Sequence, residues 1–527
     1  MKRIAPFCSL LLILCLTHSG CFSDDEPSTY YGNVVTPRAQ EFRWSDGGLP
    51  QTFDPAFAAA PPDTDAVRAL FEGLTDYDPK TLAPVPGVAT RWESSADGRV
   101  WTFYLRDNAR WSNGERVTAG DFVRSWERTL KIGPLAPHTE LLSNIEGATV
   151  PIPAPTAQPQ PNQQPSPSPS PAAPPPQFGA RAVSDNVLQV TLEQADHSFP
   201  SLVAHPVFRP VKVDHPDHTQ RLNSHELISN GAFQLSATET DRVSLDRAKT
   251  YWDDASVALD RVTFVNTANA EAALAAYRAG TVDAITNAPF EPLALKLLAP
   301  YKDFRRSTYG AVTFYAFNTS RAPFDDVRVR EALALAIDRE RVSRDDLGGS
   351  TEPAGKFLPE AMSGEKPVVD ETELLEHDAN RAKGLLAEAG YPDGENFPVI
   401  TLLINRNDQQ RVVAQSIANM WRATLNIETQ IVMRPWDEYE AAIQAGDYDI
   451  VRRGIVMQTT SELTNLRMLF EGDLPESEAQ ALKELKAMPI YFASSYAIVK
   501  PYVSGFDANV LDAPSLKNTR MDTSWTK

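Results

Sequence analysis

Helical and strand-like patterns alternate along most of this chain, and that alternation limits the folds open to it. Apolar residues recur at helical spacing in residues 270–279, 327–337, 379–389 and 409–424. Short runs rich in β-branched and aromatic residues occupy 312–317, 399–404 and 427–432. Helices interleaved with strands in this way are typical of a sheet covered by helices. The sequence therefore predicts an α/β fold.

A proline-rich segment, residues 151–177, interrupts this alternation once. It cannot form part of a core, because proline removes backbone donors and favours extended polyproline-II geometry. Strand patterns at 100–105 and 186–192 flank it, and Thr118 starts a capped helix on the near side. We therefore expect an insertion within one small α/β domain. A wall-spanning spacer and a site for a proline-recognising partner are the alternatives.

Chain length indicates the number of domains, and net charge excludes some classes of binding partner. A chain of 527 residues with 42% hydrophobic content can bury more than one core, so two or three domains are expected. The formal net charge of −19 argues against nucleic acid or anionic lipid as the partner, since binding phosphates requires a basic surface. Nothing in the sequence indicates oligomerisation, and we expect a monomer.

The first residues form a secretory leader. Lys2 and Arg3 precede an apolar run, residues 4–16, that is too short for a stop-transfer helix. All three cysteines, Cys8, Cys15 and Cys21, lie in this leader or at its end, so the mature chain holds no internal disulfide.

The surroundings of Cys21 resemble the lipobox of a bacterial lipoprotein, in which the thiol is acylated and becomes the new N-terminus. Ser19 and Gly20 precede the cysteine and an acidic stretch follows it, although His18 stands where lipoboxes usually carry leucine. The resemblance implies an exported protein of the periplasm or cell envelope, anchored to the membrane through Cys21. An ordinary leader that is cleaved nearby is the alternative.

Catalytic motifs are absent from the sequence. It contains no Gly-x-Ser-x-Gly, no phosphate-binding glycine loop and no His-Glu-x-x-His, so an enzyme is not expected. The densest histidine group, His205, His215, His218 and His225, has irregular spacing and is interpreted as part of a polar loop rather than a metal site. We expect neither a cofactor nor a metal.

Ordered landmarks from about Phe53 to about Phe506 carry a family resemblance. The most specific stretch is ATRWESSADGRVWTFYLRDNARW, residues 89–111, and further matches include FDP at 53–55, LFEGL at 70–74, NGAF at 230–233 and PFDDVRVR at 323–330. With these motifs the chain resembles family 5 of the extracellular solute-binding proteins, the oligopeptide-, dipeptide- and nickel-binding proteins of ABC importers.

The resemblance implies a bilobal, class II periplasmic-binding-protein-like fold with an extra α/β domain inserted in the first lobe. We expect residues 1–21 as the leader and 22–40 as a tether. The discontinuous first lobe would comprise 41–78, 193–302 and 490–527. The extra domain would span 79–192, and the second lobe 303–489.

The same resemblance implies that a peptide or peptide-like ligand lies between the lobes and pairs with a strand that enters the cleft. Here that strand offers Arg452, Gly454, Ile455, Val456 and Gln458.

For two of these residues, Gln458 and Arg452, the resemblance implies a more specific role. Gln458 replaces the aspartate that anchors the ligand's amino group in the family, and nearby Glu462 is a speculative substitute. Arg452 is expected to pair with a ligand carboxylate or to form a structural ion pair.

Other positions bear on the ligand site less directly. Tyr315 and Phe492 are predicted to line ligand pockets or, alternatively, to belong to the core. After about residue 469 the second lobe is shorter than in the family, by a stretch long enough for a couple of helices, so the pocket would be opened or disabled.

We therefore predict a substrate-binding lipoprotein that presents peptides to an ABC permease in the membrane. A degenerate family member that keeps the fold as an envelope scaffold is the alternative.

Overall fold

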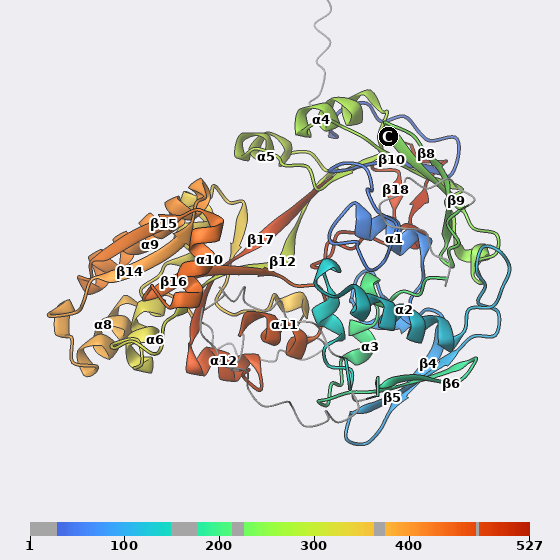
Figure 1. Ribbon diagram of the computed structural model, residues 1–527. Coiled ribbons are helices and arrows are strands. Elements are labelled where there is room, and N and C mark those ends of the chain that lie inside the picture. Colours follow the sequence, from blue (N-terminus) through green and yellow to red (C-terminus); the bar gives the residue numbers. More distant parts are fainter. Residues whose placement is uncertain (1–28, 149–176, 213–225, 363–374, 471–473, 527) are drawn as a thin grey trace, which may run out of the picture.

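The computed structural model describes residues 29–148, 177–212, 226–362, 375–470 and 474–526, and it has two lobes (Figure 1). The first hydrophobic core gathers side chains between Phe42 and Ala284 together with C-terminal residues such as Phe506. The second core is built mainly from residues between Val312 and Phe492. The bilobal α/β fold predicted from the sequence is confirmed. Cys21 and the bulk of the proline-rich insertion lie outside the described residues.

One sheet runs through both lobes. Within the described residues it has eleven strands, ordered β15-β14-β16-β12-β17-β11-β1-β10-β9-β8, with β13 beside β17. Their bounds are β1 Glu41–Asp46, β8 Phe233–Thr238, β9 Arg242–Arg247, β10 Arg261–Val265, β11 Ala284–Thr286, β12 Phe304–Phe317, β13 Thr351–Pro353, β14 Ile400–Asn405, β15 Thr429–Arg434, β16 Ile450–Val456 and β17 Ala487–Val499.

The long strands β12 and β17 connect the lobes (Figure 1). Residues 304–308 of β12 pair with the first-lobe end of β17, and residues 312–316 pair with its second-lobe end. The register shifts between the two stretches, around Gly310, whose amide donates to Val510 O at 2.7 Å and whose carbonyl accepts from Met457 N at 2.6 Å. A Cβ at position 310 would lie 2.7 Å from Met362 Cε and 2.9 Å from Val510 O, so only glycine fits this crossing point.

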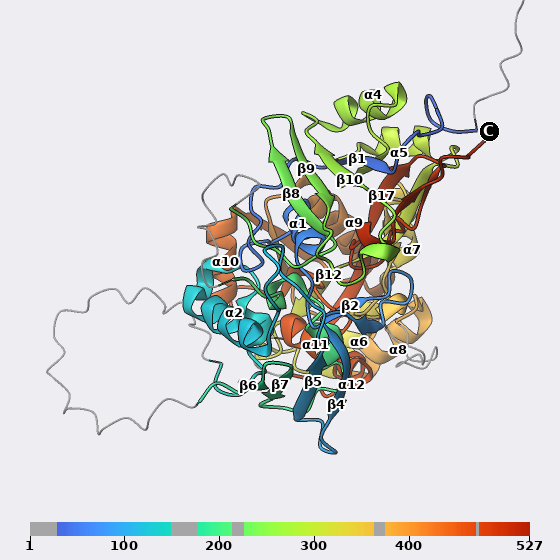
Figure 2. The same ribbon diagram turned by 90° about the vertical axis from the view of Figure 1, so that its right-hand side faces the viewer.

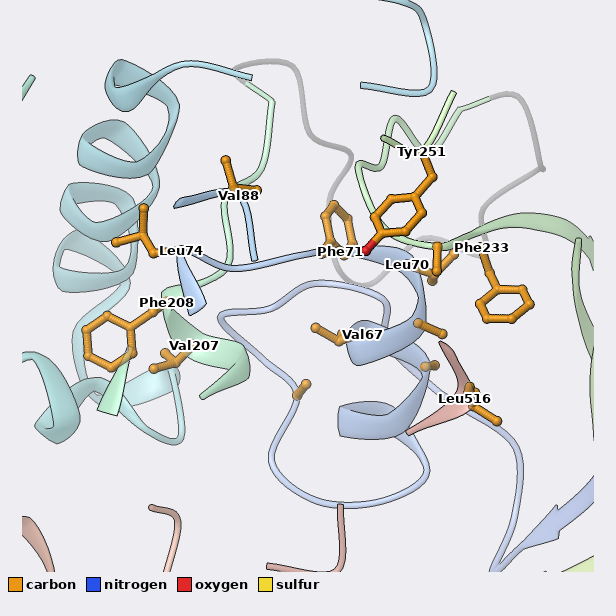
Figure 3. Packing of buried hydrophobic residues seen from close by; sticks show 14 of the residues in the cluster. Val67, Leu70, Phe71, Leu74, Val88, Val207, Phe208, Phe233, Tyr251 and Leu516 are labelled. Carbon is orange, nitrogen blue, oxygen red and sulfur yellow. The ribbon is translucent and has the colours of Figure 1, made fainter. Parts of the chain in front are cut away.

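The first lobe places α1 (Asp63–Leu70), α4 (Ala270–Ala279) and α5 (Pro292–Leu298) around its part of the sheet. Phe42 and Trp44 alternate on β1 and face inward, where Trp44 stacks on Phe264 and Phe42 contacts Phe506. Figure 3 shows the packing around α1, in which these labelled side chains converge: Val67, Leu70, Phe71, Leu74, Val207, Phe208, Phe233, Tyr251 and Leu516. Small paired strands complete the lobe: β2 (Thr75–Tyr77) with β3 (Pro84–Pro86), and β18 (Val503–Ser504) with β19 (Arg520–Met521).

The residues predicted to form the extra domain make a separate four-stranded sheet with α2 (Ala119–Ile132) packed on it. Its strand order is β4-β5-β7-β6, with bounds β4 Ala89–Ser94, β5 Val100–Leu105, β6 Ala180–Ser184 and β7 Val187–Thr191. Strands on both sides of the proline-rich segment therefore pair with each other, and Gly179 N donates to Glu146 O at 2.7 Å where the two sides meet. Thr118 and Asp121 form the capping box of α2. Figures 1 and 2 both place this sheet at the end of the molecule opposite α4.

The second lobe covers its part of the sheet with helices. Their bounds are α6 Val327–Leu335, α8 Ala379–Glu388, α9 Asp408–Leu425, α10 Trp436–Ala445, α11 Glu462–Leu469 and α12 Glu478–Glu484. Trp421 of α9 is fully buried and donates its indole N–H to Leu333 O of α6 at 2.9 Å. Asn407 and Asp378 accept backbone N–H groups at the starts of α9 and α8, as preferred for these residues. The predicted helix and strand positions agree with these elements to within about two residues, except that β12 begins at Phe304, eight residues before the predicted start at 312.

Candidate functional site

The strand β16 has an open edge. It pairs with β12 along its whole length, but β14 covers it only at Ile450 and Val451. Within the described residues no strand pairs with its outer edge at Gly454 and Val456, and both residues are exposed. Backbone groups of an antiparallel strand alternate between its two edges. Because Met457 N donates to β12 at Gly310, the groups of Gly454 and Val456 face the open edge, where a further strand could be added.

A pocket of about 450 Å³ lies beside this strand, between the extra domain and the second lobe. The 3-10 helix Thr139–Leu142 and the residues after it form one wall, and β16 and α11 form the other. Leu202 of α3 (Phe199–Leu202) contributes from the first lobe. The lining side chains are Glu140, Leu141, Ser143, Asn144, Leu202, Arg453, Ile455, Thr464, Arg467 and Met468. Of the residues predicted for the ligand site, Ile455 lies in this pocket.

Arg452 lies on the opposite face of β16. Its Nη2 donates to Thr313 Oγ1 at 3.3 Å, while its Nε is buried without a hydrogen-bond partner. No ion pair joins Arg452 to a carboxylate among the residues that the structure describes, so the structural ion pair considered from the sequence is not found. Gly454 makes room for this guanidinium, since a Cβ there would lie 3.1 Å from Arg452 Nη2. A half-buried cation without a carboxylate is suited to a ligand's negative charge.

Gln458 lies at the contact between the lobes. Its side-chain amide donates to Val456 O at 3.2 Å and also forms a hydrogen bond with His205 of the first lobe. Burial holds the pKa of His205 well below its usual range, so the imidazole is neutral; its Nδ1 accepts from Val207 N at 3.2 Å. The Oε1 of Glu462 lies at the start of α12, where it accepts from Glu478 N at 2.8 Å. Gln458 therefore has a neutral partner in the first lobe.

Tyr315 and Phe492 do not line the pocket. Their exposed fractions are 0% and 5%, and both pack in the second core, where Phe492 pairs with Val312 across β17 and β12. The core alternative for these aromatic side chains therefore describes this structure. The two side chains lie on opposite faces of the sheet, because Tyr315 pairs with Arg452, whereas Phe492 pairs with Val312 and so shares the face of Ile455. Both faces are buried at these positions. Of the histidine group, His205 is buried against the ring of His138, and the other three lie outside the described residues.

Contacts that join the lobes were not predicted from the sequence. Arg467 Nη2 of α11 donates to Gln194 Oε1 at 2.6 Å and to Asn144 Oδ1 at 3.4 Å. The hydroxyl oxygens of Ser198 and Ser461 are 2.8 Å apart. These pairs are separated by more than 260 residues in sequence, and no local pattern marks them. α11 thus forms a pocket wall and ends at Leu469, where the predicted shortening of the second lobe begins.

Two features are absent from the described part of the chain, a group of metal ligands and a membrane-spanning helix. No three His, Cys, Asp or Glu side chains are grouped there to hold a metal ion. Likewise, no helix in those ranges is long and apolar enough to cross a membrane.

Comparison with known proteins agrees with this geometry. The sequence profile of bacterial extracellular solute-binding proteins, family 5 Middle, matches residues 83–474. The chain is 30% identical, over an alignment 548 positions long, to the periplasmic murein peptide-binding protein MppA of Escherichia coli strain K12, covering 96% of each protein. It is 28% identical to the periplasmic oligopeptide-binding protein OppA of Salmonella typhimurium strain LT2, covering 90% of this chain and 91% of that protein.

Solved structures show the same arrangement of lobes. The unliganded open form of MppA is 28% identical and superposes with a TM-score of 0.78, covering 93% of this chain and 98% of MppA. Haemophilus influenzae OppA in complex with the peptide RPPGFSPFR is 25% identical and gives 0.60, covering 92% of this chain and 100% of that one. Of the two superpositions, the one with the unliganded open form of MppA gives the higher score. The chain belongs to family 5 of the bacterial extracellular solute-binding proteins.

Proposed function

We propose that this protein is the substrate-binding lipoprotein of an ABC-type importer. In this proposal it captures a peptide or peptide-like solute between its lobes and presents it to a permease in the membrane. The open edge of β16 beside the pocket is the observation that carries the proposal. A peptide main chain offers the same donors and acceptors whatever its sequence, so an open strand edge can hold many peptides. The family consists of binding proteins, and no reaction is proposed.

The relatives support this ligand class. MppA is described as a murein peptide-binding protein, and OppA as an oligopeptide-binding protein. In this chain Arg452 and the exposed main chain at Gly454 and Val456 would meet the ligand, with Ile455 beside it in the pocket. Gln458 would contribute a neutral hydrogen-bonding group. The hinge between β12 and β17 would allow the lobes to close on the ligand.

Binding is tested by calorimetry and thermal shift on the purified mature chain with mixed di- to oligopeptide pools. A ligand above its dissociation constant raises the melting temperature by mass action. Val456→Pro removes the strand-edge N–H, and it should abolish the shift without unfolding the protein, because proline is tolerated on open edges. Val183→Pro on β6, remote from the pocket, is the matched control for introducing proline at an exposed strand position.

The outcome that rejects this proposal is specific. If no pool raises the melting temperature and no peptide co-purifies by mass spectrometry, peptide capture is refuted. The scaffold alternative would then account for the retained fold.

Lipid anchoring through Cys21 is a separate part of the proposal. Acyl chains on this residue would hold the protein at a membrane surface. Expression of the full chain should place it in the membrane fraction, and Cys21→Ser should release it from that fraction. Mass spectrometry of the mature N-terminus should find a diacylglyceryl modification. An unmodified N-terminus elsewhere would indicate an ordinary cleaved leader.

A further inference from the structure

The pocket between the extra domain and α11 has an unbalanced set of charges. Arg453 and Arg467 bring two guanidinium groups to its lining, whereas Glu140 is the single carboxylate among the residues that line it. Glu140 is half-exposed and lies 3.7 Å from the imidazole of His138. The lining therefore favours an anionic group over a cationic one.

Arg467 has guanidinium N–H groups that make no hydrogen bond with the described residues. Within the described residues its side chain makes two hydrogen bonds, both from Nη2, to the neutral side-chain oxygens of Gln194 and Asn144. No ion pair of Arg467 occurs within the described ranges, and burial lowers its pKa despite the opposing effect of Asp196. A guanidinium has five N–H donors, so Nε and Nη1 remain for a ligand. A carboxylate is the partner that guanidinium geometry fits best.

The hydrogen bonds with Gln194 and Asn144 also hold the guanidinium group of Arg467 in one position. Asn144 and Gln194 are bonded to each other, since Asn144 Nδ2 donates to Gln194 O at 3.1 Å and Gln194 N donates to Asn144 Oδ1 at 3.1 Å. Arg467 is thus held against a pre-formed pair of amides on the extra domain. A side chain held in place loses little conformational entropy when a ligand binds.

We propose that this pocket is a subsite for a carboxylate of the bound peptide, with Arg467 as the residue that recognises it. The proposal rests on the proposed peptide-binding function and adds that the bound peptide places a carboxylate in this pocket. A ligand strand along the open edge of β16 would lie next to the pocket through Ile455. The carboxylate is either an acidic side chain or the peptide's C-terminus.

Matched peptides distinguish the two sources. The probes are Ala-Glu-Ala-Ala, Ala-Ala-Glu-Ala and their glutamine counterparts, each with a free or an amidated C-terminus, measured by calorimetry on the mature chain. One charge-assisted contact should make the acidic member of a pair bind roughly tenfold more tightly than its neutral counterpart. A preference for glutamate at either position identifies a side-chain carboxylate. A preference that depends only on C-terminal amidation identifies the terminal carboxylate.

Variants assign the preference to Arg467. Arg467→Gln should reduce the ratio of dissociation constants to within about twofold while the neutral peptides keep their affinity. Arg467→Lys should retain part of the ratio because the charge remains. Ser198→Ala is the matched control, since it removes another contact between the lobes without changing the charge; it should keep the full ratio. Melting temperatures verify that each variant is folded.

Three results would overturn the subsite. The first is a wild-type protein that binds neutral and acidic peptides equally; this leaves peptide capture intact. The second is a preference for acidic peptides that survives in Arg467→Gln. The third is a preference that is lost equally in Ser198→Ala, because it would then depend on how the lobes contact each other and not on Arg467. A failure of all peptides to bind would instead reject the proposed function itself.

Discussion

The hydroxyl oxygens of Ser198 and Ser461 lie 2.8 Å apart and join the first lobe to the start of α11 in the second. Ser461 follows Met457 by four residues, and Met457 is bonded to Gly310 where β12 and β17 change register. We therefore expect the contact to lie close to the pivot of the two lobes, where a hinge motion produces the smallest displacement.

A cross-link tests this placement. The chain has no cysteine after Cys21, so Ser198→Cys with Ser461→Cys introduces the one pair in the mature region. The disulfide should form under oxidising conditions and raise the melting temperature, and peptide affinity should stay within about twofold of the reduced form. Non-reducing electrophoresis and calorimetry provide the measurements. If oxidation abolished peptide binding, the contact between Ser198 and Ser461 at the start of α11 would have to open when the lobes close on the ligand.

Gly310 is predicted to be essential for stability. Gly310→Ala would place a Cβ 2.9 Å from the carbonyl of Val510, a backbone atom that cannot turn away. The free energy of unfolding should fall by about 1–3 kcal/mol, measured with denaturant. Gly384→Ala in α8 is the control: its Cβ would meet no atom within 4 Å, and it should stabilise the helix by about 0.5–1 kcal/mol. Equal effects of the two changes would contradict the packing argument.

Glu478 should make stability depend on pH. Burial raises its pKa to about 7, opposed by the amide of Leu358 and by Lys356 and reinforced by Glu462. The folded state therefore binds a proton more tightly than the unfolded state does, and this stabilisation is present at low pH and lost as pH rises from about 4.5 through 7. Glu478→Gln should remove up to about 3 kcal/mol of this decline. The exposed Glu388→Gln should leave the profile unchanged.

The buried carboxyl pair of Asp46 and Asp65 should act in the same direction. Burial raises the pKa of Asp46 to about 6 and that of Asp65 well above its usual range, and the protonated Asp65 carboxyl donates a hydrogen bond to Asp46. Arg68 opposes and Asp512 reinforces the shift at Asp65. Stability should fall as pH rises from about 4 through 6. Asp65→Asn can still donate to Asp46, so at pH 8 it should unfold with a free energy roughly 1 kcal/mol or more above wild type.

Arg452 should contribute to affinity without contributing to stability. Because no carboxylate pairs with it in the described chain, Arg452→Gln should change the melting temperature little and raise the dissociation constant of a bound free-acid peptide roughly tenfold. Arg422→Gln breaks an exposed pair with Glu428 and controls for the loss of a surface charge. A lower melting temperature with unchanged affinity would assign Arg452 a structural role.

Local sequence signals were sufficient for most elements. α4 spans the predicted residues 270–279, because Asn269 accepts an N–H group at its start and Gly280 adopts positive φ at its end. β5 likewise occupies the predicted 100–105, where inward residues alternate with outward ones. These features depend on neighbours within a few residues, which the sequence displays directly.

The site required information that no local pattern contains. Ile455 and Arg467 reach the same pocket from different elements, and the charge of Arg467 is answered by amides from the extra domain. Tyr315 and Phe492 are core side chains because both faces of the sheet are buried where they lie, which residue type alone does not reveal. Which face of a strand meets a partner is decided by the packing of segments hundreds of residues apart.

The pairing of β11 with Ile498 and Val499 has a consequence for how the protein acquires its structure. The first core also includes Tyr502, Phe506, Leu516 and Met521. Core residues near the start of the chain therefore lack some of their apolar contacts until the ribosome has synthesised these C-terminal residues. Loop-closure entropy makes such long-range contacts slow to form. The first lobe therefore cannot finish folding while the polypeptide is still being synthesised, and a product that stops before residue 498 leaves an unpaired strand and an apolar surface exposed to aggregation and proteolysis.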